Sequence, residues 1–186
     1  MNNSEIDALL AKHESDTWSV NAMSRSEQIA LPKGKIAITI DRNGEWFYQG
    51  ESFKRPSMVV MLSQSLIKIE NKYFLIAPEQ RLEIRVEDCP FVTAQVVQSG
   101  DKERIEVRIS NGDQFEIGPS HPLCLQNLPD SNQQIPIIKV RDNLCARFSR
   151  ACYYQLAEWA FETSLDGAQS VCVKSNDHCY SIGVSS

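Results

Sequence analysis

Two stretches of the chain share a residue pattern at the same internal spacing, and this echo constrains the fold more than any other feature. The first, residues 55–65, reads RPSMVVMLSQS, and the second, residues 141–151, reads RDNLCARFSRA. In both, large apolar residues stand three and seven positions after the arginine, a serine stands eight positions after it, and a small residue stands ten positions after it. We interpret the echo as a duplicated folding unit. Duplication creates an interface between copies at which a ligand could bind.

Length, composition and charge narrow the class of protein. A chain of 186 residues fits one large domain or two small ones. The net charge of −5 argues against general nucleic-acid binding, which depends on neutralising phosphates. The start of the chain, MNNSEID, has no signal-peptide pattern, and no apolar run approaches the ~20 residues that span a bilayer. We expect a cytoplasmic protein with no nucleic-acid or membrane partner, and nothing indicates its oligomeric state.

The six cysteines do not form a metal-binding or redox motif. No two of them stand in a C-x-x-C pair. His178 and Cys179 lie near Cys172, but their spacing is not that of a zinc site. We therefore expect buried thiols and neither a metal nor a cofactor.

The first half of the chain predicts a hairpin, a helix and a second hairpin. Apolar residues alternate at period two in the expected strands, and Asp41 to Gly44 has turn composition. Pro56 stands where a helix tolerates proline, at its first position. The predicted elements are strands 36–40 and 45–48, a helix over 58–66, strands 67–70 and 73–76, and a further strand 82–86.

The second half predicts the same plan with a longer helix. Asp142 is the expected N-cap, and apolar residues from Leu144 to Ala160 keep helical spacing. The predicted elements are strands 105–109 and 115–117, a proline-rich loop 119–136, the long helix ending at 166–167, and a hairpin of 171–173 with 180–182.

These patterns predict an α+β fold, built as a tandem duplication of a hairpin-helix-hairpin unit. Tight turns join the strands, so we expect antiparallel sheets. Residues 1–91 would hold an N-terminal helix (4–13), a connecting arm (14–35) and the first repeat. Residues 92–186 would hold the second repeat with the long helix.

Four short motifs, in this order and spacing, resemble the bacterial domain of unknown function 1285 family over roughly residues 33–165. They are GEWFYQG at 44–50 followed by Arg55, VEDCPF at 86–91, HPL at 121–123, and Val140-Arg141 followed by Leu144, Ala146-Arg147, Arg150 and Tyr153-Tyr154.

The resemblance implies a duplicated α+β fold whose C-terminal half loosely resembles a pleckstrin-homology domain. It also implies a pocket between the halves, a nucleotide-like ligand and a role in signal transduction. Three carboxylates typical of the family are replaced here by Gln80, Cys145 and Gln155. These replacements weaken an enzymatic interpretation more than a binding one.

Arg55 and Arg141 each precede a predicted helix, whose N-terminus offers free N–H groups and a partial positive charge. We favour Arg55 as the anion contact, because Asp142 would cap the second helix itself. The alternative is that both arginines pair with acids such as Glu87 and Asp88.

Arg147 and Arg150 lie three residues apart, so on one helix they would share a face. Their guanidinium groups could bind phosphate at two points. A solvated, salt-bridged face is the alternative. Tyr154 is a candidate for stacking on a ligand, although packing of Tyr153 and Tyr154 in the core is favoured.

Glu87, Asp88 and His121 are the remaining candidates. The two carboxylates fall at the predicted seam between the copies, where a turn is the favoured alternative. His121 could act as a general base, but a hydrogen-bonded loop histidine is the better interpretation, and no nucleophile-elbow motif occurs.

The leading hypothesis is a non-catalytic binding or sensor module for a small anionic, nucleotide-like ligand at the repeat interface. Its ligand-binding residues would be Arg55, Arg141, Arg147, Arg150, Glu87, Asp88, His121 and Tyr154. One alternative is a hydrolytic enzyme that uses His121 with Glu87 or Asp88. Another is a protein-interaction adaptor.

Overall fold

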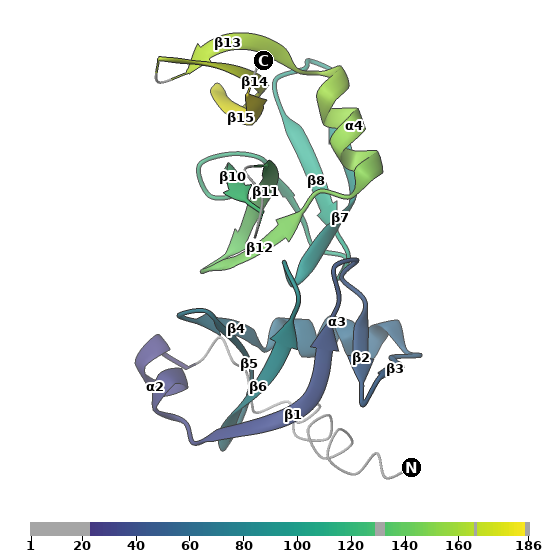
Figure 1. Cartoon of the computed structure of the whole chain (residues 1–186), viewed down its shortest axis with the longest axis vertical. Helices are drawn as coiled ribbons and strands as arrows, with labels where there is room; N and C mark the ends of the chain where they lie inside the picture. The colour runs from purple at the N-terminus through teal and green to yellow at the C-terminus, as the bar shows by residue number, and fades with distance from the viewer. Residues whose placement is uncertain (1–22, 129–132, 166, 185–186) are drawn as a thin grey trace. The chain divides into compact units, whose positions relative to one another are not determined.

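Figure 1 shows the computed structural model of the chain, which describes residues 23–128, 133–165 and 167–184. The helix predicted over residues 4–13 lies outside these ranges. The chain divides into two compact units, residues 1–88 and 89–186. The described residues are mostly β, with three short helices. None of these helices has the length and apolar character needed to cross a membrane.

The described part of the N-terminal unit, residues 23–88, is one six-stranded sheet with two helices. Its strand order is β3-β2-β1-β6-β5-β4. All pairs are antiparallel except β1 with β6, which run parallel. The elements are α2 (Arg25–Ala30), β1 (Lys33–Ile40), β2 (Trp46–Tyr48), β3 (Glu51–Ser52), α3 (Pro56–Gln64), β4 (Leu66–Ile69), β5 (Lys72–Ala77) and β6 (Gln80–Val86).

The predicted hairpins of this unit are confirmed as β1–β2 and β4–β5. The Asp41 carboxylate shapes the first turn, because its Oδ1 accepts from the backbone N–H groups of Asn43 and Glu45, each at 2.8 Å. The predicted helix is also confirmed, and Pro56 is its first residue. The helix α2 was not predicted, although Ser24 and Glu27 form a capping box before and within it.

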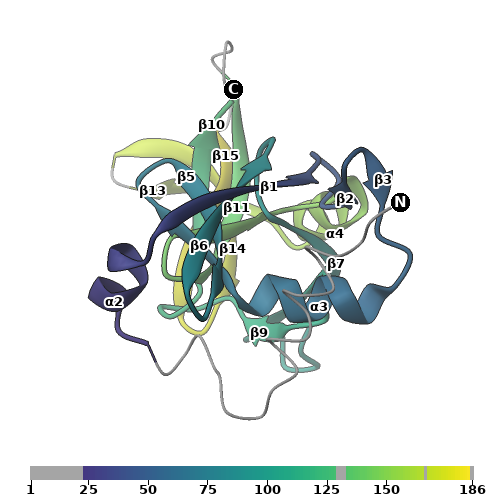
Figure 2. The ribbon, with the colours of Figure 1, turned by 90° about the horizontal axis from the view of Figure 1, so that it is seen from below.

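Alternation places two apolar faces on this sheet. Ile36, Ile38 and Ile40 of β1 are buried on one face, and Figures 1 and 2 show α3 lying across the sheet. A second cluster has Ile67, Phe74 and Ile76 at its centre, with Met23, Leu31 and Ile69 packed against it. Both faces are therefore buried in part, as in a layered core.

The described residues of the C-terminal unit form a six-stranded sheet, a three-stranded sheet and one helix. The orders are β10-β11-β12-β7-β8-β9 and β13-β14-β15. The elements are β7 (Phe91–Gln98), β8 (Ile105–Ile109), β9 (Gln114–Glu116), β10 (Leu123–Asn127), β11 (Gln134–Arg141), β12 (Leu144–Arg147), α4 (Arg150–Glu158), β13 (Phe161–Leu165), β14 (Ala168–Ser175) and β15 (His178–Val184).

The two six-stranded sheets repeat one plan. Each consists of two three-stranded meanders, and the first strand of the first meander pairs in parallel with the last strand of the second, β1 with β6 and β7 with β12. The expectation of wholly antiparallel sheets is therefore wrong at these two pairs. Tight turns force antiparallel neighbours only within a meander, whereas the connection between meanders is a crossover.

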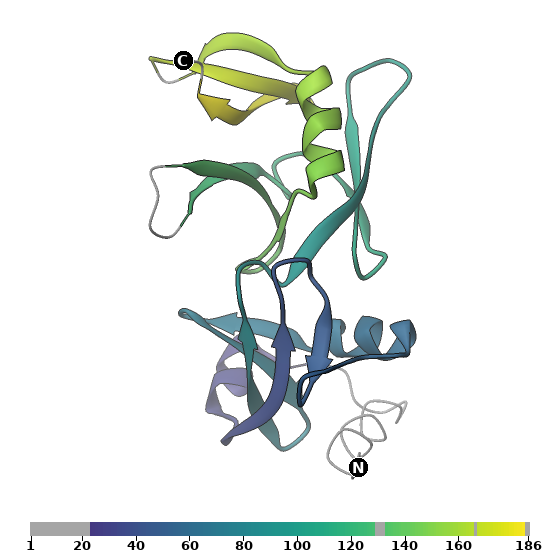
Figure 3. The same cartoon turned by 45° about the vertical axis from the view of Figure 1, so that its right-hand side comes forward.

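The repeat differs from the predicted hairpin-helix-hairpin unit. In the first sheet α3 joins the two meanders, but in the second α4 follows both of them. Figure 3 shows α4 leading from the end of β12 toward the three-stranded sheet. The helix is thus not part of the repeated plan.

The echo that suggested duplication does not match equivalent places in the two sheets. Arg55 precedes α3, whereas Arg141 ends β11, the strand that takes the place of β5. The long helix predicted from Asp142 is wrong as well. Asp142 lies in the β11–β12 turn with φ 45°, and the helix begins only at Arg150.

The other strands of the C-terminal unit divide into confirmed and unexpected ones. The predicted hairpins are confirmed as β8–β9 and β14–β15. The turn of the second hairpin places Asn176 and Asp177 at φ 49° and 61°, as two-residue hairpin loops require. β10 lies within the predicted proline-rich loop, and β13 stands where the long helix was expected to continue.

Candidate functional site

A pocket of about 410 Å³ lies in the C-terminal unit, where the start of β11, the end of β12 and the start of α4 meet. This volume is in the range of small-molecule sites, about 300–1,000 Å³. Its lining residues are Gln134, Ile135 and Pro136 of β11, Arg147 and Phe148 at the end of β12, and Arg150 and Tyr153 of α4.

Hydrogen bonds at the start of α4 fix the helical wall of this pocket. Ser149 is the N-cap, and its Oγ accepts from the Cys152 N–H at 3.4 Å. The Ser149 N–H in turn donates to Oγ1 of the buried Thr93 in β7 at 3.0 Å. Because Arg150 and Tyr153 are three residues apart on this anchored helix, their side chains share a face.

Arg150 carries an exposed charge whose neighbour is neutral. Its Nε and Nη2 donate to the Tyr154 hydroxyl at 3.3 and 3.2 Å, and the guanidinium carbon lies 5.6 Å from the centre of that ring. The hydrogen bond to Tyr154 raises the pKa of Arg150 above its ordinary value. Among the described residues, the side chain is therefore held in place by a neutral hydroxyl and not by a carboxylate.

Arg147 is the second arginine that lines the pocket, and it also has an interaction within the chain. The remaining lining is apolar at Ile135, Pro136 and Phe148, with the Tyr153 ring beside it. Two guanidinium groups next to an apolar wall are suited to an anion that carries an apolar body.

Arg147 and Arg150 both line this pocket, but the prediction that they lie on one helix face is wrong. Arg147 ends β12, and Arg150 opens α4. The preference for tyrosines packed in the core is wrong, because Tyr153 is 36% exposed and Tyr154 is 54% exposed. The ring that lines the pocket is that of Tyr153, whereas Tyr154, the predicted stacking residue, holds Arg150.

Arg141 is half-buried and engaged within its own unit. Its guanidinium carbon lies 5.5 Å from the centre of the Phe91 ring, and Nη1 lies 3.7 Å from Oδ2 of Asp113. Burial lowers the pKa of Arg141, and the charge of Asp113 opposes that shift. The arginine ties β11 to the β7–β9 side of the sheet, so we assign it no ligand.

His121 has the contacts of a structural loop residue. Its ring stacks on Phe115 with the centroids 4.4 Å apart. Nδ1 lies 3.2 Å from the Lys139 carbonyl oxygen, which can only accept, so Nδ1 carries the proton. This arrangement fits the interpretation of a hydrogen-bonded loop histidine.

The other three predicted site residues belong to the N-terminal unit. Arg55 is exposed and is the N-cap of α3, without a side-chain capping bond. Glu87 donates its N–H to the Ile40 carbonyl at 3.0 Å, and its Oε1 lies 3.9 Å from Nη2 of Arg85. Asp88 is partly buried. Their roles in ligand binding stay predictions.

Sequence reasoning missed the strand wall of the pocket. Gln134, Ile135 and Pro136 all fall within the predicted proline-rich loop 119–136, and Phe148 falls in the predicted helical stripe. Residues 135–138 are all apolar, so this stretch does not alternate between apolar and polar residues as a half-exposed strand does. The sequence signal that could have indicated the helical wall was the three-residue spacing of Arg150 and Tyr153, which places both side chains on one face of a helix.

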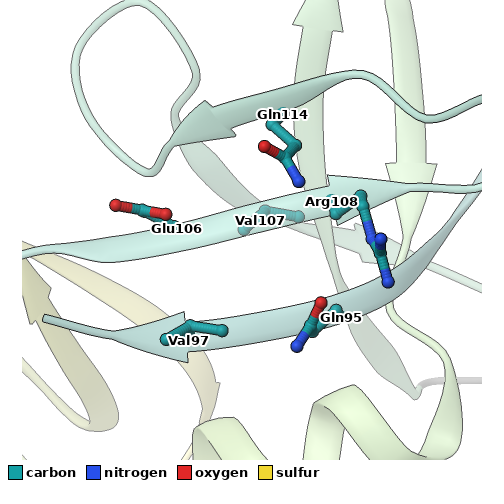
Figure 4. Close-up of a pocket in the computed structure, with 6 residues that line it drawn as sticks. All are labelled: Gln95, Val97, Glu106, Val107, Arg108 and Gln114. Carbon is teal, nitrogen blue, oxygen red and sulfur yellow. The ribbon is translucent and has the colours of Figure 1, made fainter.

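A second hollow lies on the exposed face of β7, β8 and β9 (Figure 4). Its lining residues are Gln95, Val97, Glu106, Val107, Arg108 and Gln114. Its volume is about 30 Å³, the space that one water molecule takes in the liquid. It is too small to hold an organic ligand, so the larger pocket is the candidate site.

The cysteines and acids offer no metal centre among the described residues. Cys89, Cys152 and Cys172 are buried as expected, but Cys124 and Cys179 are exposed. Burial raises the pKa of Cys172, which keeps this thiol protonated.

Comparison with known proteins identifies relatives of unknown function. The model of the DUF1285 N-terminal domain, a domain of unknown function, matches residues 31–89. The model of the C-terminal domain of the same protein family matches residues 90–182. No curated protein matches the chain.

Two crystal structures of similar fold are DUF1285 family proteins. The one from Silicibacter pomeroyi DSS-3 is 24% identical with a TM-score of 0.79, over 99% of this chain and 97% of that one. The one from Shewanella baltica OS155 is 23% identical with a TM-score of 0.52, over 66% of this chain and 91% of that one. At these identities the likeness concerns the fold.

Proposed function

The chain belongs to the DUF1285 family, whose function is unknown, and from that premise we propose that it is a non-catalytic module that binds a small anionic ligand in its C-terminal unit. The ligand occupies the pocket of about 410 Å³, with Arg147 and Arg150 as its charge partners. Nucleotide-like compounds are the first candidates. The signalling role implied by the family resemblance stays a prediction.

The observation that carries this proposal is the placement of two arginines in one pocket of an acidic protein. A chain with a net charge of −5 repels anions at long range, so an anion site needs local guanidinium groups. Arg150 supports it most directly, because a neutral hydroxyl rather than a carboxylate holds its side chain. An anion could therefore bind there without displacing an acidic residue.

A thermal-shift screen of nucleotides and other small anions tests the proposal. A ligand at 100 times its Kd should add about 2.7 kcal/mol to the free energy of unfolding. The double variant Arg147→Gln with Arg150→Gln should lose this stabilisation. Each guanidinium removed takes with it a charge-assisted hydrogen bond to the ligand, worth about 1.5–3 kcal/mol.

The matched control is Arg108→Gln, which removes an exposed arginine of β8 that is not among the residues lining the 410 Å³ pocket. It should leave the ligand-induced shift unchanged. The proposal fails if no anion raises the melting temperature. It also fails if the pocket variant and the control respond to the ligand equally.

A further inference from the structure

We infer that the ligand is an amphipathic anion, with one terminal carboxylate or phosphate monoester on a flat ring, and that the ring packs against Tyr153. This inference rests on the proposed function and narrows it to a chemical class. Polyphosphates and simple inorganic anions fall outside the class.

The charge of the pocket sets the first limit. Arg147 and Arg150 are the charged side chains among its described lining residues. Two guanidinium groups match a carboxylate, or a phosphate monoester with about −1.5 to −2 charge at pH 7. A triphosphate would bring an excess of negative charge into a protein that is itself acidic.

The apolar lining sets the second limit. Ile135, Pro136 and Phe148 form a surface without charge beside the two arginines. Pro136 and Phe148 are buried and Ile135 is partly exposed, so the accessible part of this surface is limited. An inorganic anion would leave that part in water and would gain nothing there from the hydrophobic effect. A ligand body that covers it adds affinity in proportion to the apolar area removed from water.

The Tyr153 ring favours a flat body over an aliphatic one. The side chain is 36% exposed, so part of the ring is accessible from solvent, and it lines the pocket. Aromatic rings pair in offset-stacked or edge-to-face arrangements and gain energy beyond the burial of area. The i to i+3 spacing from Arg150 places the ring beside the anion-binding end, which is the order of groups in an aryl phosphate or aryl carboxylate.

Isothermal titration of the full chain with defined probes tests the class. The probes are inorganic phosphate, phenyl phosphate, benzoate, a nucleoside monophosphate and the matching triphosphate. Phenyl phosphate should bind at least tenfold more tightly than inorganic phosphate, and the triphosphate no more tightly than the monophosphate. Benzoate against phenyl phosphate shows which anionic group the two arginines prefer.

The variant Tyr153→Leu separates stacking from charge. It should weaken phenyl phosphate about tenfold while leaving inorganic phosphate unchanged, because only the ring contact is lost. Phe161→Leu is the matched control, since Phe161 is an aromatic residue of the same unit with a similar exposure of 42% and lies outside the pocket lining. Its binding of every probe should equal that of the native chain.

The outcomes distinguish the two levels of the proposal. If none of the probes binds, the proposed anion-binding function fails, and the ligand class fails with it. If inorganic phosphate binds as tightly as phenyl phosphate, or if Tyr153→Leu weakens both equally, the function stands and the flat ring is refuted. A triphosphate that binds tenfold more tightly than the monophosphate refutes the limit on charge.

Discussion

The two six-stranded sheets share a strand order but are completed in different ways. In the N-terminal unit the helix α3 joins the two meanders, and α2 precedes the first strand. In the C-terminal unit the meanders follow each other without a helix between them, and α4 and a three-stranded sheet come afterwards. The same sheet plan is therefore combined with different helices and additional strands in the two units.

The difference shows where this fold can acquire a site. The pocket of the C-terminal unit requires a helix that starts directly after the last strand of the second meander, because Arg147 ends that strand and Arg150 opens the helix. In the N-terminal unit the last strand, β6, ends the unit instead. The candidate site thus depends on α4, which is not part of the repeated sheet plan.

The largest expected effect comes from truncating the buried leucine by which each helix packs in its unit. Leu62 of α3 and Leu156 of α4 are both fully buried. Leu62→Ala and Leu156→Ala should each lower the free energy of unfolding by about 2–5 kcal/mol, because each leaves a cavity. Urea denaturation gives the magnitude, and amide hydrogen exchange gives the unit affected.

Hydrogen exchange should accelerate in β1 and β6 for Leu62→Ala and in β7 for Leu156→Ala. Val97→Ala, at an exposed position in β7, is the control and should change stability by no more than about 0.5 kcal/mol. Unchanged exchange in the strands of either unit would show that its helix does not cover the sheet.

A smaller effect is expected from a hydroxyl that joins the two sheets of the C-terminal unit. Ser175 Oγ at the end of β14 donates to the Ile117 carbonyl at 2.7 Å and accepts from the Ile105 N–H at 3.0 Å. The residue is fully buried. Ser175→Ala should cost about 1–3 kcal/mol in urea denaturation, because it leaves a buried N–H without its acceptor.

Ser164→Ala is the control for this hydroxyl, since Ser164 is exposed in β13 of the same three-stranded sheet. If Ser175→Ala unfolds like the control, the Ser175 hydroxyl adds nothing measurable to the contact between the two sheets, which the hydrogen bonds of Asn176 to Glu103 and Ile117 would then maintain.

The hairpins of this chain could be predicted because their signals are local. Alternation over 36–40 and 105–109, with Gly44 and Gly112 at φ 77° and 97° in the turns, specifies strand, turn and register within a dozen residues. Pro56 likewise marks the start of α3 locally.

The parallel pairs and the true start of α4 could not be predicted, because both depend on distant residues. Leu144, Phe148 and Leu156 keep helical spacing, yet the chain changes from strand to helix at Ser149. The strand is selected by pairing of Ala146 with Phe91 and Ile138, which lie elsewhere in the sequence. The misplaced helix start also hid the wall of the pocket.

The smallest expected effect compares the two helix starts directly. Ser149 caps α4 through its side chain, whereas Arg55 occupies the same position of α3 without a capping bond. Ser149→Ala should lower the free energy of unfolding by about 1 kcal/mol. Arg55→Ser should raise it by a similar or smaller amount, because Arg55 has φ −110° and ψ 107°, the extended backbone that a capping serine adopts. Urea midpoints of both variants, with unchanged slopes, measure the pair.

If Ser149→Ala lowers the stability and Arg55→Ser raises it, then arginine is a less favourable N-cap for α3 than a serine at the same position would be. An arginine retained there at a cost to the helix favours the interpretation of Arg55 as a contact for a ligand or partner, since the residue is exposed and its side chain makes no capping bond. A loss of stability in Arg55→Ser would instead show that the arginine supports the N-terminal unit itself. In that case the contrast between the two helices would lie in their contacts with the sheets, where the leucine variants measure it.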